Sequence, residues 1–116
     1  MAVQPIIDHR EVIDEALIRE ITERIVKAFN PRRIILFGSH ARGDARPDSD
    51  LDLMVEMESD LNFYSRIPLV TSIFGLRKWP MDLFVYTPAE IAKDKDVNGT
   101  LVNLIEREGK VLYARK

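Results

Sequence analysis

The 116-residue sequence contains no cysteine, so disulfide bonds and thiolate metal sites are excluded. It also lacks any apolar run as long as a membrane span. The first residues, MAVQPIIDHR, do not show the basic region and apolar core of a signal peptide. We therefore expect a cytoplasmic protein with no membrane partner.

A large excess of charge of one sign is absent too, because 17 lysines and arginines stand against 19 aspartates and glutamates. The formal net charge of −2 gives no global basic field, so we expect no direct nucleic-acid binding, although local arginines could still bind one nucleotide. The length and the 46% of hydrophobic residues fit one domain, residues 1–116, with a real core.

The first periodic segment predicts an amphipathic helix over residues 9–30. Apolar residues recur along it every four positions: Ile13, Leu17, Ile21, Ile25 and Phe29. Asp8, followed three residues later by Glu11, has the pattern of a capping box at the start of this helix. Pro31 is expected to end it.

Three apolar segments are predicted to be strands: residues 34–37 (IILF), 51–56 (LDLMVE) and 81–86 (MDLFVY). Gly38 ends the first strand, and the segment 43–50, rich in Gly, Pro, Asp and Ser, is a loop. In the second strand the apolar residues Leu51, Leu53 and Val55 share one face and Asp50 and Asp52 share the other.

The rest of the chain reads mostly as helices. One is expected over 60–76, where Pro68 should end, kink or split it. A capping box over 87–90 predicts a helix start. A last helix near 99–108 is followed by Gly109 and a short closing strand at 111–113. The fold class is therefore α/β, with three or four strands and helices packed against them.

The segment with the most chemical information is Gly38-Ser39, ten residues, and then Asp50-Leu51-Asp52. Carboxylates at positions i and i+2 of a strand lie on one side, with Cα atoms about 6.5–7 Å apart. Such a pair can bind Mg²⁺ together with substrate phosphates and so support in-line phosphoryl or nucleotidyl transfer. Asp82, near the start of the next strand, can supply a third carboxylate.

Gly38 and Ser39 are the candidate phosphate-binding residues. Backbone N–H groups at such a turn, with the Ser39 hydroxyl, suit the β- and γ-phosphates of a nucleoside triphosphate. Gly38 lets a phosphate approach without a Cβ in the way. Arg42 or Arg46 could neutralise phosphate charge, and Arg42 is the better placed.

The segment GSHARGDARPDSDLDLMV (38–55) closely resembles the signature of the DNA polymerase β-like nucleotidyltransferase superfamily, above all its minimal nucleotidyltransferase (MNT) branch. The match is residue by residue at these positions: Gly38, Ser39, Ala41, Arg42, Gly43, Ser49, Asp50, Asp52 and Leu53. The ending IEREGKVLYA (105–114) also looks like the end of these domains. His40 and Met81 differ mildly from the common pattern, and neither change removes a catalytic atom.

The resemblance implies a small mixed sheet with flanking helices, similar to the palm of polymerase β. It implies ATP as nucleotide donor and Mg²⁺, or Mn²⁺, as metal. Asp50 and Asp52 would bind the metal, and Asp82 would join them and help to activate the acceptor hydroxyl. Many relatives are antitoxins of HEPN/MNT pairs, in which AMP is transferred to a tyrosine of a small helical HEPN ribonuclease toxin.

Three functions follow from these observations. The first is transfer of AMP from ATP to a hydroxyl of a partner HEPN toxin, by an antitoxin in a heteromeric complex. The second is a non-catalytic antitoxin that neutralises the toxin by binding; the intact carboxylate set argues against it. The third is a transferase of the antibiotic-modifying type, which is disfavoured because little chain remains to form an acceptor pocket.

Some residues have a structural interpretation first. Trp79 could stack on a nucleobase, but packing is favoured. The apolar run 61–74 is read as core, with part of it available to cover a partner. The basic pairs Arg32-Arg33 and Arg115-Lys116 are read as solvated ends of elements.

Overall fold

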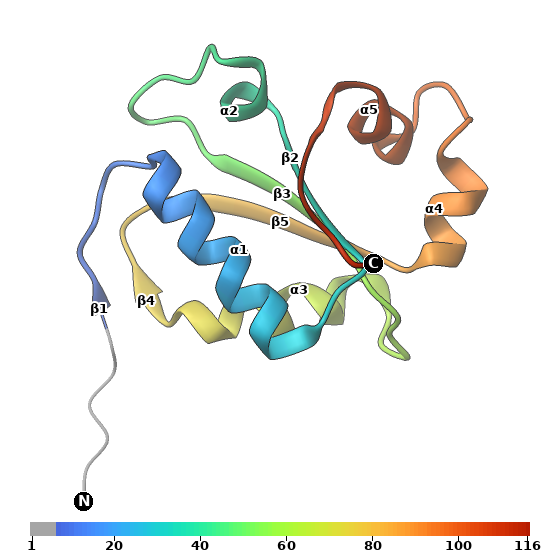
Figure 1. Ribbon diagram of the computed structural model, residues 1–116, viewed down its shortest axis with the longest axis horizontal. Helices are drawn as coiled ribbons and strands as arrows, with labels where there is room; N and C mark the ends of the chain where they lie inside the picture. Colours follow the sequence, from blue (N-terminus) through green and yellow to red (C-terminus); the bar gives the residue numbers. More distant parts are fainter. Residues whose placement is uncertain (1–6) are drawn as a thin grey trace, which may run out of the picture.

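The computed structural model describes residues 7–116, and a four-stranded mixed sheet of order β5-β3-β2-β6 forms its centre (Figure 1). Strand β2 (Arg33–Phe37) is antiparallel to β3 (Leu51–Glu56) and to β6 (Lys110–Ala114). Strand β5 (Met81–Tyr86) is parallel to β3. The expected α/β class and mixed sheet are confirmed, and the three predicted strands lie within one residue of their expected bounds.

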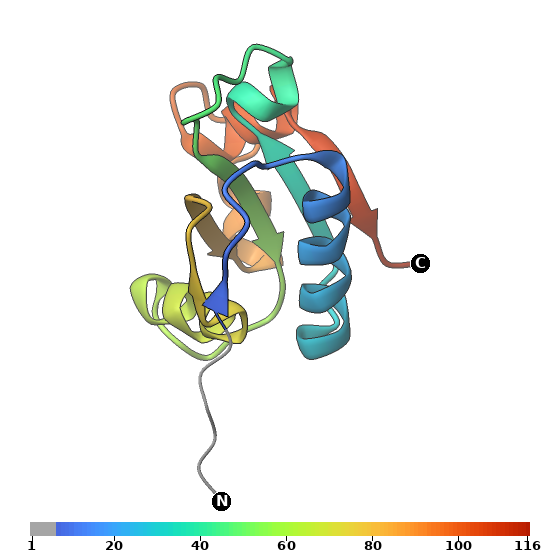
Figure 2. The same cartoon turned by 90° about the vertical axis from the view of Figure 1, so that its left-hand side faces the viewer.

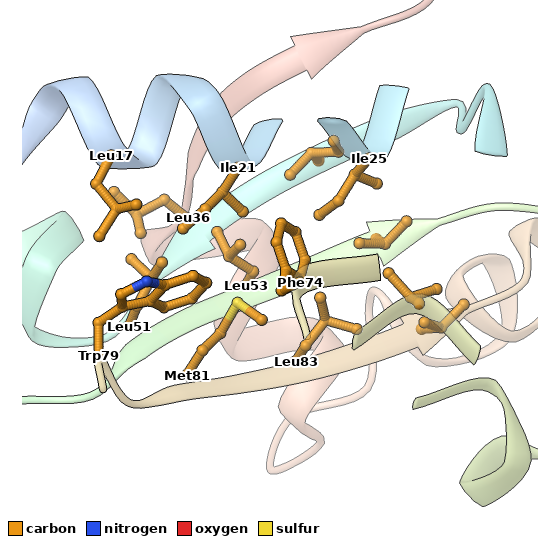
Figure 3. Packing of buried hydrophobic residues seen from close by; sticks show 14 of the residues in the cluster. Leu17, Ile21, Ile25, Leu36, Leu51, Leu53, Phe74, Trp79, Met81 and Leu83 are labelled. Atoms are coloured by element: carbon orange, nitrogen blue, oxygen red, sulfur yellow. The ribbon is translucent and has the colours of Figure 1, made fainter. Parts of the chain in front are cut away.

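One face of the sheet packs against α1 (Glu15–Phe29) and the segment from α3 (Phe63–Thr71) through η1 (Ser72–Phe74). Figure 2 shows α1 running alongside the strands. Figure 3 shows the resulting core, in which side chains from both sequence halves interdigitate: Leu17, Ile21, Ile25, Leu36, Leu51, Leu53, Phe74, Trp79, Met81 and Leu83. Their burial stabilises the fold through the hydrophobic effect.

The other face is covered by α4 (Pro88–Asp94) and α5 (Leu101–Glu108), which lie together on one side in Figure 1. A second, smaller core forms there from these side chains: Ile35, Phe37, Met54, Ile91, Val102 and Ile105. The predicted capping box is confirmed, because the Thr87 hydroxyl accepts from the Glu90 N–H and the Glu90 carboxylate accepts from the Thr87 N–H. The predicted last helix and closing strand are present as α5 and β6.

The start of α1 differs from the prediction. The helix begins at Glu15 because Asp14 is its N-cap, with a carboxylate that accepts from the Leu17 N–H at 2.8 Å. The capping box expected at Asp8 and Glu11 is therefore wrong. Asp8 belongs instead to β1 (Ile7–Asp8), which pairs in parallel with β4 (Leu76–Arg77).

The helix expected over 60–76 is shorter than predicted, and Pro68 lies inside α3 without splitting it. The chain leaves helical geometry after η1 because Gly75 adopts a positive φ of 61°. A two-residue strand, β4, follows. Within residues 7–116 no helix is both long enough and apolar enough to cross a membrane.

Candidate active site

The three predicted aspartates lie at one end of two neighbouring parallel strands. Asp52 on β3 and Asp82 on β5 are direct partners in the register of that pair. Asp50 immediately precedes β3. Asp52 is half-buried, whereas Asp50 and Asp82 are exposed to solvent. The sheet thus brings the carboxylates of Asp52 and Asp82 side by side. Asp50 lies two residues before Asp52 in the sequence.

Gly38 lies directly against the Asp52 carboxylate. An ideal Cβ placed on Gly38 would be 2.2 Å from Asp52 Oδ2, far inside van der Waals contact. Gly38 also has a φ of 73°, a conformation that other residues rarely adopt. Phe37, the residue before it, pairs with Asp52 across β2 and β3. A side chain at residue 38 would therefore displace the carboxylate.

The electrostatics of this cluster raise the pKa of Asp52 above its usual value. Partial burial of the carboxylate is the main cause, and the negative charges of Asp82 and then Asp50 add to it. The positive charges of His40 and Arg42 act in the opposite direction. The three carboxylates are thus close enough to repel one another, and a bound cation would relieve that repulsion.

The turn after β2 is a short helix, α2 (Ser39–Arg42). The N–H groups of Ala41 and Arg42 donate to the Gly38 carbonyl, each at 3.1 Å. The N–H groups of Ser39 and His40 precede them and have no acceptor within the helix, so they are available to an anion. His40 Nε2 lies 3.3 Å from the Ser49 carbonyl, which connects this turn to the loop before Asp50.

Arg42 lies on the same turn but its side chain is engaged with a neighbour. Its Nε donates to Asp44 Oδ2 at 3.3 Å, and half of the side chain is exposed. Exposed pairs of this kind contribute little to stability, so a ligand phosphate could compete with Asp44. The structure thus places Gly38, Asp52 and Asp82 together and pairs Arg42 with Asp44.

Among residues 7–116, no three His, Asp or Glu side chains form a preformed metal cage. Mg²⁺ does not need one, because it usually binds one or two carboxylates together with water and substrate phosphates. Asp52 and Asp82, paired in register, supply that number of ligands. The donor set therefore fits a hard divalent cation that arrives with a nucleotide.

The interpretation of Trp79 holds, that of the 61–74 run holds in part, and that of the basic pairs fails at Arg33. Trp79 is 1% exposed and packs in the core, with Nε1 donating to Asp8 at 2.9 Å. In the 61–74 run Val70 and Phe74 are core, while Tyr64 remains 79% exposed. Arg33, read as a solvated end, instead pairs with Glu56 and Glu106. That network joins residues far apart in sequence, so no local pattern could have revealed it.

Comparison with known proteins assigns the chain to a family. Residues 17–114 match the family described as the nucleotidyltransferase domain. This stretch contains all the candidate residues named above: Gly38, Ser39, Arg42, Asp50, Asp52 and Asp82. The chain therefore belongs to the nucleotidyltransferase domain family, and it is an enzyme of the nucleotidyltransferase type.

Two curated proteins are similar to it. One is a candidate protein adenylyltransferase of Methanocaldococcus jannaschii, 30% identical over 102 residues that cover 86% of this chain and 98% of that protein. The other is the protein adenylyltransferase MntA of Thermococcus cleftensis, 39% identical over 62 residues that cover 51% of this chain and 59% of that protein. The sequence resemblance to the MNT branch is consistent with both.

Two solved structures share the fold. A candidate nucleotidyltransferase from Sulfolobus solfataricus superposes with a TM-score of 0.61 at 24% identity, over 86% of this chain and 79% of that one. A toxin–antitoxin complex with AMP-PNP contains a chain that superposes with a TM-score of 0.53 at 18% identity, over 84% and 74% of the two chains. At these identities the similarity is one of fold.

Proposed function

We propose that this protein is an antitoxin that transfers AMP from ATP to a hydroxyl group, that of a tyrosine, on a partner HEPN toxin in a heteromeric complex. Family membership supports the nucleotidyl transfer, and the names of both curated relatives support a protein acceptor. The shared fold with a chain of a toxin–antitoxin complex is consistent with a toxin partner. We place the reaction in the cytoplasm, within a single domain of residues 1–116.

One observation carries the proposal: the Asp52 carboxylate is fitted against Gly38 and lies in register with Asp82. This arrangement joins the candidate phosphate turn to the candidate metal ligands. A protein that only masked its partner would gain nothing from crowded carboxylates that repel one another, since repulsion destabilises the folded state.

The reaction is an in-line displacement at phosphorus. The acceptor oxygen attacks the α-phosphorus of ATP, a new P–O bond forms, and the bond to the bridging oxygen of the β-phosphate breaks, so that pyrophosphate leaves. A divalent cation, Mg²⁺ or Mn²⁺, held by Asp50, Asp52 and Asp82, would neutralise charge on the phosphate oxygens. Asp82, the more exposed partner of the pair, would accept the hydroxyl proton.

The remaining residues of the turn position the nucleotide. The N–H groups of Ser39 and His40, at the start of α2, and the Ser39 hydroxyl would bind the β- and γ-phosphates. Arg42 would exchange Asp44 for a phosphate oxygen. Holding the phosphates at this turn fixes the α-phosphorus near Asp52, and such positioning is a large part of catalysis by phosphoryl-transfer enzymes.

The test uses ATP labelled in either the α- or the γ-phosphate, with Mg²⁺ and the toxin that co-purifies with this protein. AMP transfer labels the toxin from α-labelled ATP alone, whereas phosphoryl transfer would label it from γ-labelled ATP. The Asp50→Ala/Asp52→Ala variant is the control. If that variant still binds and inhibits the toxin, and the native protein transfers no label, binding is the function and the proposed transfer is wrong.

A further inference from the structure

A cavity lies at the far end of the sheet from the aspartates. It has a volume of about 490 Å³ and is bordered by six charged side chains: Arg32, Arg33, Glu56, Lys95, Glu106 and Arg115. Strand β3 connects the two ends, since Asp52 is near its start and Glu56 is its last residue. Four residues of strand separate them by roughly 13 Å.

Both carboxylates of this cavity pair with the same arginine, Arg33. Arg33 Nε donates to Glu56 at 2.5 Å, and Arg33 Nη2 donates to Glu106 at 2.5 Å. Glu56 is buried, with 6% of its surface exposed, so this pairing satisfies a charge that would otherwise be costly in the interior. Arg33 therefore explains the position of both glutamates, and together with Arg32 it balances their two charges, which leaves Lys95 and Arg115 in excess.

Three other cations at the cavity have no comparable role. Arg32 reaches Glu56 only at 3.9 Å and is 55% exposed. Within residues 7–116, neither Lys95 nor Arg115 has a carboxylate oxygen within 4.0 Å; Arg115 donates to the Asn30 carbonyl at 3.2 Å. Four basic side chains thus face two acidic ones, in a chain whose formal net charge is −2.

Two of these cations are held next to each other by the backbone. The Arg115 N–H donates to the Arg32 carbonyl at 2.8 Å, continuing the antiparallel pairing in which Arg33 faces Ala114. Arg32 and Arg115 are therefore directly opposite each other, and like charges in that position destabilise a sheet. An anion bound between them would remove this cost.

We propose that this cavity is a binding site for a small phosphate-bearing anion, held by Arg32, Lys95 and Arg115. Guanidinium groups match phosphate oxygens with paired N–H donors, and the lysine adds a point charge. The basic surplus is confined to one concave site, which suits a small anion better than a long nucleic acid, whose backbone needs an extended basic track. The site is independent of the proposed transfer, because it shares no residue with the aspartate cluster.

The experiment is a titration of the ¹⁵N-labelled protein with inorganic pyrophosphate, followed by amide chemical shifts in the presence of EDTA. We expect the largest shifts at Ala92, Lys95 and Arg115. We expect at least tenfold weaker binding in Arg32→Ala/Arg115→Ala. The matched control, Arg19→Ala/Lys27→Ala, removes two charges on α1 and should bind as the native protein does. Should the first variant fail to fold, Lys95→Ala, at an exposed position, should weaken binding severalfold.

Other outcomes overturn the proposal. The absence of shifts at these residues would mean that the cavity binds no phosphate. Equal weakening in both double variants would mean only a general charge effect. Shifts confined to residues 38–52 would place the pyrophosphate at the aspartate end. If a short single-stranded RNA displaced pyrophosphate at an RNA concentration below that of the pyrophosphate, we would conclude that the cavity binds a nucleic acid and that the proposal of a small anion is wrong.

Discussion

The Asp52 carboxylate fills the space that a side chain at Gly38 would need, with Asp52 Oδ2 only 2.2 Å from the position of a Cβ there. The glycine at the phosphate turn therefore has two roles in this fold. Its positive φ shapes the turn, and its missing side chain allows the carboxylate to reach its position beside Asp82. This relationship leads directly to the first prediction.

Gly38→Ala should reduce AMP transfer on the order of 100-fold, because the new methyl group displaces Asp52, and displacements of about 1 Å have that effect on catalysis. Gly99→Ala is the matched control. Gly99 also has a positive φ, of 91°, but a Cβ there meets nothing within 4 Å. Both variants should lose roughly 1–2 kcal/mol of stability from backbone strain. Equal transfer rates in the two would contradict the predicted role of Gly38.

Addition of ATP should raise the thermal unfolding midpoint when Mg²⁺ is present and much less in EDTA. ATP at 100 times its Kd stabilises a protein by about 2.7 kcal/mol when it binds only the folded state. Asp52→Asn should abolish the dependence on Mg²⁺ while the protein remains folded. A shift of the same size in EDTA would show that the phosphates bind without the carboxylate site.

The Asp8 carboxylate should make the free energy of unfolding depend on pH. Hydrogen bonds from Arg10 and Trp79 hold the pKa of Asp8 far below its usual value, although burial acts in the opposite direction. A depressed pKa stabilises the folded protein at neutral pH, and this contribution is lost as the pH falls below about 4. Asp8→Asn should lower the free energy of unfolding by about 1 kcal/mol at pH 7. It should also reduce the dependence of this free energy on pH below about 4. Glu11→Gln, in an exposed pair with Lys78, should leave urea unfolding profiles almost unchanged.

Substitution of Arg66 should lower the free energy of unfolding more than substitution of an exposed charged residue does. Arg66 is 6% exposed and donates to the carbonyls of Leu61 and Val85 and to the Glu90 carboxylate. Arg66→Ala would leave the buried Val85 carbonyl without this donor and would remove the ion pair with Glu90, which we expect to cost about 2–3 kcal/mol in chemical denaturation. Lys78→Ala, at an exposed position, should change the free energy of unfolding by less than about 0.5 kcal/mol. A cost for Arg66→Ala as small as this would refute the role of Arg66.

The placement of the aspartates was accessible from the sequence because strand periodicity is local. Leu51 and Leu53 are apolar and Asp52 lies between them, so the carboxylate had to face away from that core. The proximity of Asp52 and Asp82 could be expected from the mixed sheet that the family resemblance implies. The fit of Asp52 against Gly38 was not accessible, because it depends on the register between β2 and β3.

Long-range contacts explain the failures. The sequence pattern at Asp8 and Glu11 predicted a capping box, but the Asp8 carboxylate accepts from Nε1 of Trp79, 71 residues away, and Asp14 caps the helix. Similarly, Arg33 has the local context of a solvated loop residue, but Glu106, 73 residues away, binds it. A local sequence pattern does not contain such contacts, so it cannot predict them.

The central claim is that the carboxylates beside Gly38 carry out nucleotidyl transfer. The most direct measurement is the initial rate of label transfer from α-labelled ATP to the partner toxin by the native protein and by Asp52→Asn, with the affinity of each complex measured in parallel. We predict a rate at least about 100-fold lower in the variant, with unchanged affinity for the toxin. Equal rates in the two proteins would contradict the account.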